Sequence, residues 1–150
     1  PRYFAGADYA AQPTRATLAN AMDVGAPSNF ERLRHWHRSD AELRAGFVAA
    51  SVDDATIREV VREAPTRHGI VACPHTATGL KLLQDLRAAG DTRPWAVVAT
   101  AHPAKFESIV EPLVGRVVEP PPALAECLAR PARAVAMAPE YHALKAVLEG

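Results

Sequence analysis

The stretch Gly69-Ile70-Val71-Ala72-Cys73-Pro74-His75-Thr76-Ala77-Thr78-Gly79 carries the first indication of the fold. Its apolar run, residues 69–73, is short and predicts a buried strand. From Thr76 to Ala89 leucines recur at helical spacing, and Gly90 marks the end of a predicted helix. A strand that leads through a tight turn into a helix is the building unit of an α/β fold.

The same unit occurs on either side of this stretch. Residues 47–52 predict a strand, followed by a helix that ends at Pro65 and has Ser51 and Asp54 in capping-box spacing at its start. Residues 95–99 are apolar on both faces, as in a strand covered by helices, and another helix follows. This alternation predicts an α/β fold: part of a mainly parallel sheet flanked by helices, with right-handed crossovers.

Further elements are expected around this core. Short helices are predicted over residues 14–22, 28–37, 123–129 and 140–149. Five of the 13 prolines fall within residues 120–139, which predicts an extended surface strap. We expect residues 1–150 to form a single α/β segment.

Composition limits the classes of function. The chain has 150 residues, is 49% hydrophobic and carries 17 basic and 17 acidic side chains, which is typical of one soluble globular domain. A net charge of zero argues against nucleic-acid or anionic-membrane partners, and no apolar run approaches the roughly 18–20 residues of a membrane span. Cys73 and Cys127 are far apart and suit a reducing compartment, so we expect a cytoplasmic protein. Because the first residue is Pro1, we expect the chain to begin within a longer protein.

Two predicted turns are candidates for chemistry. Residues 73–79 and 100–105 each follow a predicted strand, where ligands bind in open α/β sheets. Both turns offer a hydroxyl and an imidazole beside a helix start, whose free amide groups favour anions. A plainer alternative is that Thr76 and Thr100 only cap the helices.

Three patterns, in their order and spacing, resemble the threonine synthase family. They are Ala19-Asn20-Ala21-Met22-Asp23-Val24-Gly25-Ala26-Pro27-Ser28-Asn29, Pro74-His75-Thr76-Ala77 and Thr100-Ala101-His102-Pro103-Ala104-Lys105-Phe106. The resemblance covers nearly the whole chain. It implies the C-terminal part of a pyridoxal-phosphate-dependent lyase of fold type II, which converts O-phosphohomoserine and water to threonine and phosphate.

The resemblance also implies roles for individual residues. Thr100 stands where the family's threonine faces the pyridine nitrogen of the cofactor, and a neutral hydroxyl can donate there without adding charge. Five residues are expected to form the pocket wall: His75, Thr76, Asn20, Asp23 and His102. The sequence departs from the family at Ala19, commonly a serine, and at Cys73, often an aspartate, so no hydroxyl or charge role is assigned there.

The resemblance further implies that essential parts lie outside this chain. The family's Schiff-base lysine and glycine-rich phosphate turn lie in an N-terminal segment, and none of Lys81, Lys105 and Lys145 matches that lysine. No glycine-rich phosphate motif occurs here. We therefore expect no catalytic residue in this segment, an inactive isolated chain, and the missing N-terminal part of the same protein as its partner.

Two other classes of function remain open. The segment could be a non-catalytic α/β module for partner binding or assembly, marked by a large exposed apolar surface. It could instead be a metal-assisted phosphohydrolase that uses His75, His102 and Asp23. Those three residues include no pair at helical i, i+4 spacing, so we expect no metal site.

Overall fold

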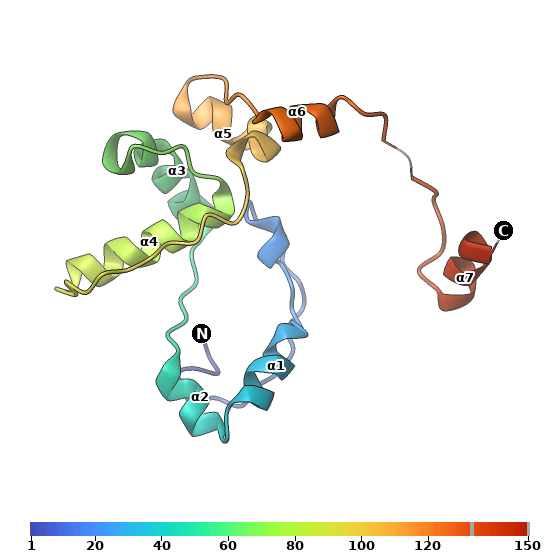
Figure 1. The fold of residues 1–150 in the computed structure, drawn as a ribbon. Coiled ribbons are helices and arrows are strands. Elements are labelled where there is room, and N and C mark those ends of the chain that lie inside the picture. The colour runs from blue at the N-terminus through green and yellow to red at the C-terminus, as the bar shows by residue number, and fades with distance from the viewer. Residues whose placement is uncertain (133, 150) are drawn as a thin grey trace. The chain divides into compact units, whose positions relative to one another are not determined.

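The computed structural model describes residues 1–132 and 134–149, and it is helical. Its elements are η1 (Asn20–Met22), α1 (Asn29–Trp36), α2 (Asp40–Gly46), α3 (Asp54–His68), α4 (Pro74–Ala88), η2 (Pro103–Phe106), α5 (Glu107–Val114), α6 (Pro122–Leu128) and α7 (Tyr141–Glu149) (Figure 1). The chain divides into two compact units, Pro1–Glu119 and Pro120–Gly150. No helix in the described part is long and apolar enough to cross a membrane.

The predicted parallel sheet is wrong for the described residues, which contain no strand. Residues 47–52, 69–73 and 95–99 are irregular connections instead. The physical reason is that a strand needs a neighbour whose carbonyl and amide groups complete its hydrogen bonds. Among the described residues, no backbone hydrogen bond joins any of these three runs to another.

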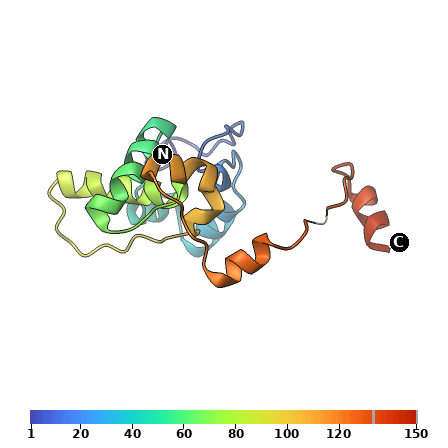
Figure 2. The same ribbon diagram turned by 90° about the horizontal axis from the view of Figure 1, so that it is seen from above.

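The main core of the first unit lies between α3 and α4, with α5 and η1 packed beside them (Figure 2). Helix α3 presents Ile57, Val60, Val61 and Ala64 at the predicted helical spacing, and all four side chains are buried. Val110 of α5 is fully buried against them. The apolar face predicted for this helix therefore forms the centre of the unit.

The limits of α3 correct two predictions. Its N-cap is Asp53, whose carboxylate accepts a hydrogen bond from the Thr56 amide at 2.8 Å, so the capping box of Ser51 and Asp54 is not used. The helix also continues past Pro65 to Gly69, which closes it at φ +69°. A proline inside a helix removes one N–H and crowds the carbonyl four residues earlier. The hydrogen bonds beyond it still form, since the carbonyl of Pro65 accepts from Gly69 N at 3.1 Å.

A second apolar cluster holds the N-terminal segment against α1 and α2. Tyr3, Phe30 and Leu43 are its buried members. The sequence predicts α1 within one residue but misses α2, which is capped by Ser39. The helix predicted over residues 14–22 is also wrong, because only the short η1 turn forms there.

The second unit contains α6 and α7. Each lies within one residue of its predicted helix. The proline-rich strap predicted over 120–139 includes α6 and also Arg133, which lies outside the described residues. Several large apolar side chains of this unit, including Leu128, Tyr141 and Leu148, are exposed.

Candidate functional site

The turn that leads into α4 is built from buried polar side chains. Cys73 is the N-cap, and its Sγ accepts a hydrogen bond from the Thr76 amide at 3.4 Å. The Thr76 hydroxyl lies 3.2 Å from the same sulfur. Cys73, His75 and Thr76 are all buried. The capping alternative is therefore wrong for Thr76. The N-cap of α4 is Cys73, and the Thr76 hydroxyl only contacts the sulfur of that cap.

His75 connects α4 to both other elements of the resemblance. Its Nε2 accepts a hydrogen bond from the backbone amide of Ala21, in η1, at 3.0 Å. Its ring lies 5.0 Å from the ring of Phe106, at the end of η2. The three sequence patterns, far apart along the chain, therefore meet at one buried imidazole.

The turn that carries Asn20 is held by two carboxylates. Asp23 accepts from the amide of Thr17 at 2.6 Å and from its hydroxyl at 2.7 Å. Asp54, across the core, accepts from the amide of Leu18 at 2.9 Å. Asn20 itself is exposed, and its side chain makes no hydrogen bond to the described residues. Asp23 thus acts within the turn, while Asn20 is free to contact a ligand.

Asp54 anchors the chain beside the candidate site, a role that the sequence did not predict. The pair Asp53-Asp54 offers two carboxylates where one is enough for an N-cap. The second is then available for a long-range contact, here with Leu18. The second carboxylate of the Asp53-Asp54 pair is the one feature of the sequence that could have indicated this contact.

The connection of residues 89–102 between α4 and η2 runs back along α4 (Figure 1), and Thr100 lies near its end. Val97 of this connection packs on α4 at Gly79, where an added Cβ would lie 3.1 Å from Val97 Cγ1. Thr100 is exposed, and its hydroxyl makes no hydrogen bond to the described residues. The capping alternative is wrong here too, because His102 caps η2 through Nδ1, which accepts from the Ala104 amide at 3.2 Å.

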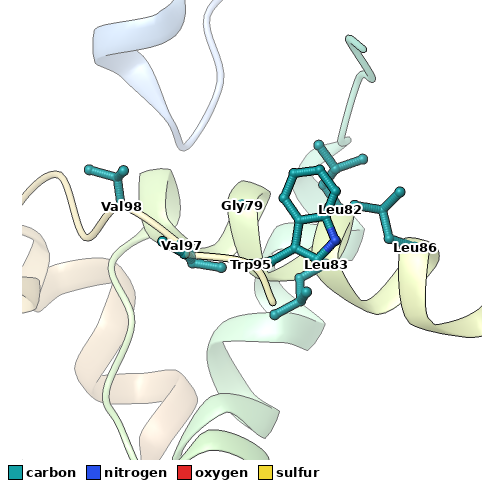
Figure 3. A pocket seen from close by; sticks show the side chains of 8 residues that line it. Gly79, Leu82, Leu83, Leu86, Trp95, Val97 and Val98 are labelled. Carbon is teal, nitrogen blue, oxygen red and sulfur yellow. The ribbon is translucent and has the colours of Figure 1, made fainter. Parts of the chain in front are cut away.

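An apolar groove of about 200 Å³ separates part of this connection from α4 (Figure 3). Its walls are Gly79, Leu82, Leu83 and Leu86 of the helix and residues 95–98 of the connection. No titratable side chain lines it. The groove is therefore a packing surface and offers no reactive group.

The start of the connection is fixed by Asp91. Its carboxylate pairs with the Arg93 guanidinium at 2.6 Å and accepts a hydrogen bond from Trp95 Nε1 at 3.3 Å. Hydrogen bonds from Arg93 hold the pKa of Asp91 well below its usual range. The sequence analysis did not single out this cluster, because its residues match no functional motif.

The structure thus brings together some of the expected pocket residues and leaves others apart. His75, Thr76 and the turn with Asn20 and Asp23 form one assembly. His102 belongs to η2, next to this assembly through Phe106. No hydrogen bond among the described residues joins Thr100 to it.

Two of the three lysines and the proposed metal ligands have other partners. Lys81 pairs with Asp85, and Lys145 lies 3.5 Å from Glu149. For the metal-assisted alternative, His75 Nε2 and both oxygens of Asp23 already accept hydrogen bonds. The described residues include no group of three His, Cys, Asp or Glu side chains placed to hold one ion. The geometry does not favour that alternative.

Comparisons with known proteins agree with the resemblance. A family model described as "Threonine synthase, C-terminal" matches residues 76–148. Threonine synthase of Escherichia coli is 34% identical over 126 residues, which are 84% of this chain and 29% of the relative. The protein of that name from Serratia marcescens is 34% identical over 125 residues, 83% of this chain and 28% of its own length.

Solved structures show the same relationship. The crystal structure of threonine synthase from Escherichia coli matches with a TM-score of 0.82 and 30% identity, over 99% of this chain and 34% of that one. A pyridoxal-phosphate-bound threonine synthase from Brucella melitensis matches with a TM-score of 0.63 and 25% identity, over 87% of this chain and 33% of that one. The chain spans about a third of the length of these relatives.

Proposed function

Because this chain belongs to the threonine synthase family and matches the C-terminal part of its members, we propose that it forms that part of a pyridoxal-phosphate-dependent lyase. The complete protein would convert O-phosphohomoserine and water to threonine and phosphate. The chain corresponds to about a third of its relatives, so the reaction is a property proposed for the whole protein.

One observation carries this proposal: the three family-like patterns converge on His75. Ala21 of the first pattern donates to its Nε2, and Phe106 of the third packs against its ring. Residues 21 and 106 are distant in sequence, and a shared contact through a buried side chain requires a specific tertiary arrangement. Such convergence of separate patterns is typical of a ligand site.

Thr100 fits the chemistry of the cofactor's ring nitrogen. The hydroxyl is exposed and has no partner among the described residues, so it is available to donate one hydrogen bond. A neutral alcohol orients the ring without placing a negative charge beside it. When bound, the cofactor stabilises negative charge on substrate carbon, and the protein supplies orientation and electrostatics. His75, Thr76, Asn20, Asp23 and His102 would shape the wall beside it.

The parts that this chain lacks would come from the rest of the polypeptide. None of its three lysines matches the family's cofactor-binding lysine, and the sequence has no glycine-rich phosphate turn. We therefore place both in an N-terminal part of the same protein. That part is the proposed macromolecular partner of this segment, and O-phosphohomoserine is the proposed small-molecule partner.

The same part would supply the neighbouring strands that these apolar runs lack. Residues 47–52, 70–72 and 95–99 have apolar sequences and make no backbone hydrogen bond to the described residues, as unassembled strands do. Val48 and Val98 are 78% and 74% exposed, although valine favours buried strands. Pairing with strands from the N-terminal part would bury these side chains and satisfy the backbone.

The test compares the 150-residue chain with the full-length protein. We expect the full-length protein to show the visible absorption of bound cofactor and to release phosphate from O-phosphohomoserine. The isolated chain should show neither, and adding the separately produced N-terminal part should restore both. Cofactor absorption or turnover by the isolated chain would contradict the proposed division of parts.

A non-catalytic binding module is the second candidate, since exposed apolar side chains such as Trp36 and Val98 of the first unit are typical of an interaction surface. The two candidates differ in what precedes Pro1. An upstream lysine followed by a glycine-rich turn favours the enzyme, and their absence from the reading frame favours the module.

A further inference from the structure

We infer that His75 is a positioning residue that holds the Asn20 turn at the substrate site, and that it does so as the neutral imidazole with its proton on Nδ1. This inference rests on the proposed function and assigns to His75 a role more specific than pocket wall. Its basis is the geometry of one side chain and the two elements that it joins.

The hydrogen bond from Ala21 determines the tautomer. A backbone N–H can only donate, so Nε2, 3.0 Å away, must present a lone pair. In a neutral imidazole the proton is then on Nδ1. A charged imidazolium carries protons on both nitrogens and could not accept this bond.

The cost of this arrangement indicates that the bond at Nε2 matters. His75 is 7% exposed, and its Nδ1 is buried without a hydrogen-bond partner among the described residues. A buried donor without an acceptor is unfavourable. The other tautomer would lose the hydrogen bond from the Ala21 amide. The observed tautomer keeps that bond at Nε2 and leaves the Nδ1 proton without an acceptor.

The imidazole also packs against one neighbouring ring, and the backbone of His75 is fixed within α4. The Phe106 ring lies 5.0 Å away, at an interplanar angle of 51°. On the main chain, the carbonyl of His75 accepts a hydrogen bond from the Thr78 hydroxyl at 2.8 Å, within the first turn of α4. A ring packed in this way is a rigid acceptor for the Ala21 amide, and a movement of the ring would move the turn.

The turn held by this bond has one free polar side chain at its start, that of Asn20. The flanking bonds of Asp54 to Leu18 and of Asp23 to Thr17 fix the chain before the turn. The side chain of His75 makes the hydrogen bond that ties the turn itself to α4, beside the apolar contact of Ala19 with the same core. Loss of the bond should therefore displace Asn20 and weaken substrate binding, while the groups that react are unaffected.

Two substitutions separate positioning from packing in the full-length protein. In His75→Gln the amide oxygen can reach the place of Nε2, whereas in His75→Asn it reaches only the place of Nδ1. We expect the Asn variant to raise KM for O-phosphohomoserine about tenfold with little change in kcat, and the Gln variant to stay near the wild type. His35→Gln, at an exposed histidine, is the matched control and should change neither constant. Equal KM values for the Gln and Asn variants would overturn the inference.

A spectroscopic measurement keeps the inference testable if the variants do not fold. In the uniformly ¹⁵N-labelled wild-type protein, the His75 signals should show a protonated Nδ1 and an unprotonated Nε2, and the Ala21 amide should exchange slowly with solvent. A protonated Nε2 would overturn the inference whatever the enzymatic activity. A protein with this tautomer that does not turn over O-phosphohomoserine would instead contradict the proposed function.

Discussion

Gly25 lies directly against the backbone of Gln12. The Gln12 amide donates to the Gly25 carbonyl at 3.0 Å, and a Cβ added to Gly25 would lie 1.7 Å from the Gln12 carbonyl oxygen. This contact closes the loop that contains the Asn20 turn. No side chain larger than hydrogen fits there without displacement of the backbone.

Gly25→Ala should therefore destabilise the full-length protein by at least about 1–3 kcal/mol, the usual cost of overpacking. Thermal unfolding is the measurement. Gly46→Ala is the control, since nothing lies within 4 Å of its added Cβ and alanine is the better helix former at the end of α2. A Gly25→Ala protein as stable as the wild type would show that residues 12 and 25 are not in contact.

Cys73→Ala should cost about 1 kcal/mol of unfolding free energy, because it removes the side-chain cap of α4. Denaturant unfolding of the full-length protein measures it. Cys127→Ala is the matched control, since Cys127 is exposed and caps no helix, and it should be nearly neutral. If the two variants are equally stable, Cys73 does not act as a cap.

Asp91→Asn should change how stability depends on pH. The folded protein lowers the pKa of Asp91 below its unfolded value of about 3.9, so the carboxylate stabilises the fold above that pH. This contribution is lost as the pH falls through the lower, folded pKa. The variant should thus be less stable than the wild type at neutral pH, and the difference should shrink below about pH 4.

The control for Asp91→Asn is Asp85→Asn, which disrupts only the surface pair with Lys81 and should have a smaller effect at neutral pH. Urea unfolding at several pH values measures both variants. A difference between Asp91→Asn and the wild type that does not change with pH would contradict the assignment.

Thr100→Val should lower cofactor affinity or turnover of the full-length protein at least about tenfold, because valine matches threonine in shape but cannot donate to the ring nitrogen. Thr100→Ser keeps the hydroxyl and should retain most of both. Absorption titration with pyridoxal phosphate and phosphate release are the measurements. Unchanged values for Thr100→Val would remove the proposed role of this residue.

The family and most of the helices could be predicted from the sequence alone. Apolar residues at helical spacing located α1, α3, α4 and α7, and in α3 these residues form the buried face of the helix. The helix α2 was missed because it is short and buries only Leu43. Three short patterns were enough to identify the threonine synthase family, since their order and spacing are linear properties.

Contacts between distant residues were decided only by the tertiary structure. Apolar runs such as 95–99 have strand-like sequences, yet they form no strand in the described chain, because pairing depends on a neighbour and not on the run itself. The bond from Ala21 to His75 and that from Leu18 to Asp54 likewise join residues whose proximity no local pattern encodes. The tendency of a segment to form a helix depends on its own residues, whereas the partner of a buried polar atom is determined by how the helices pack.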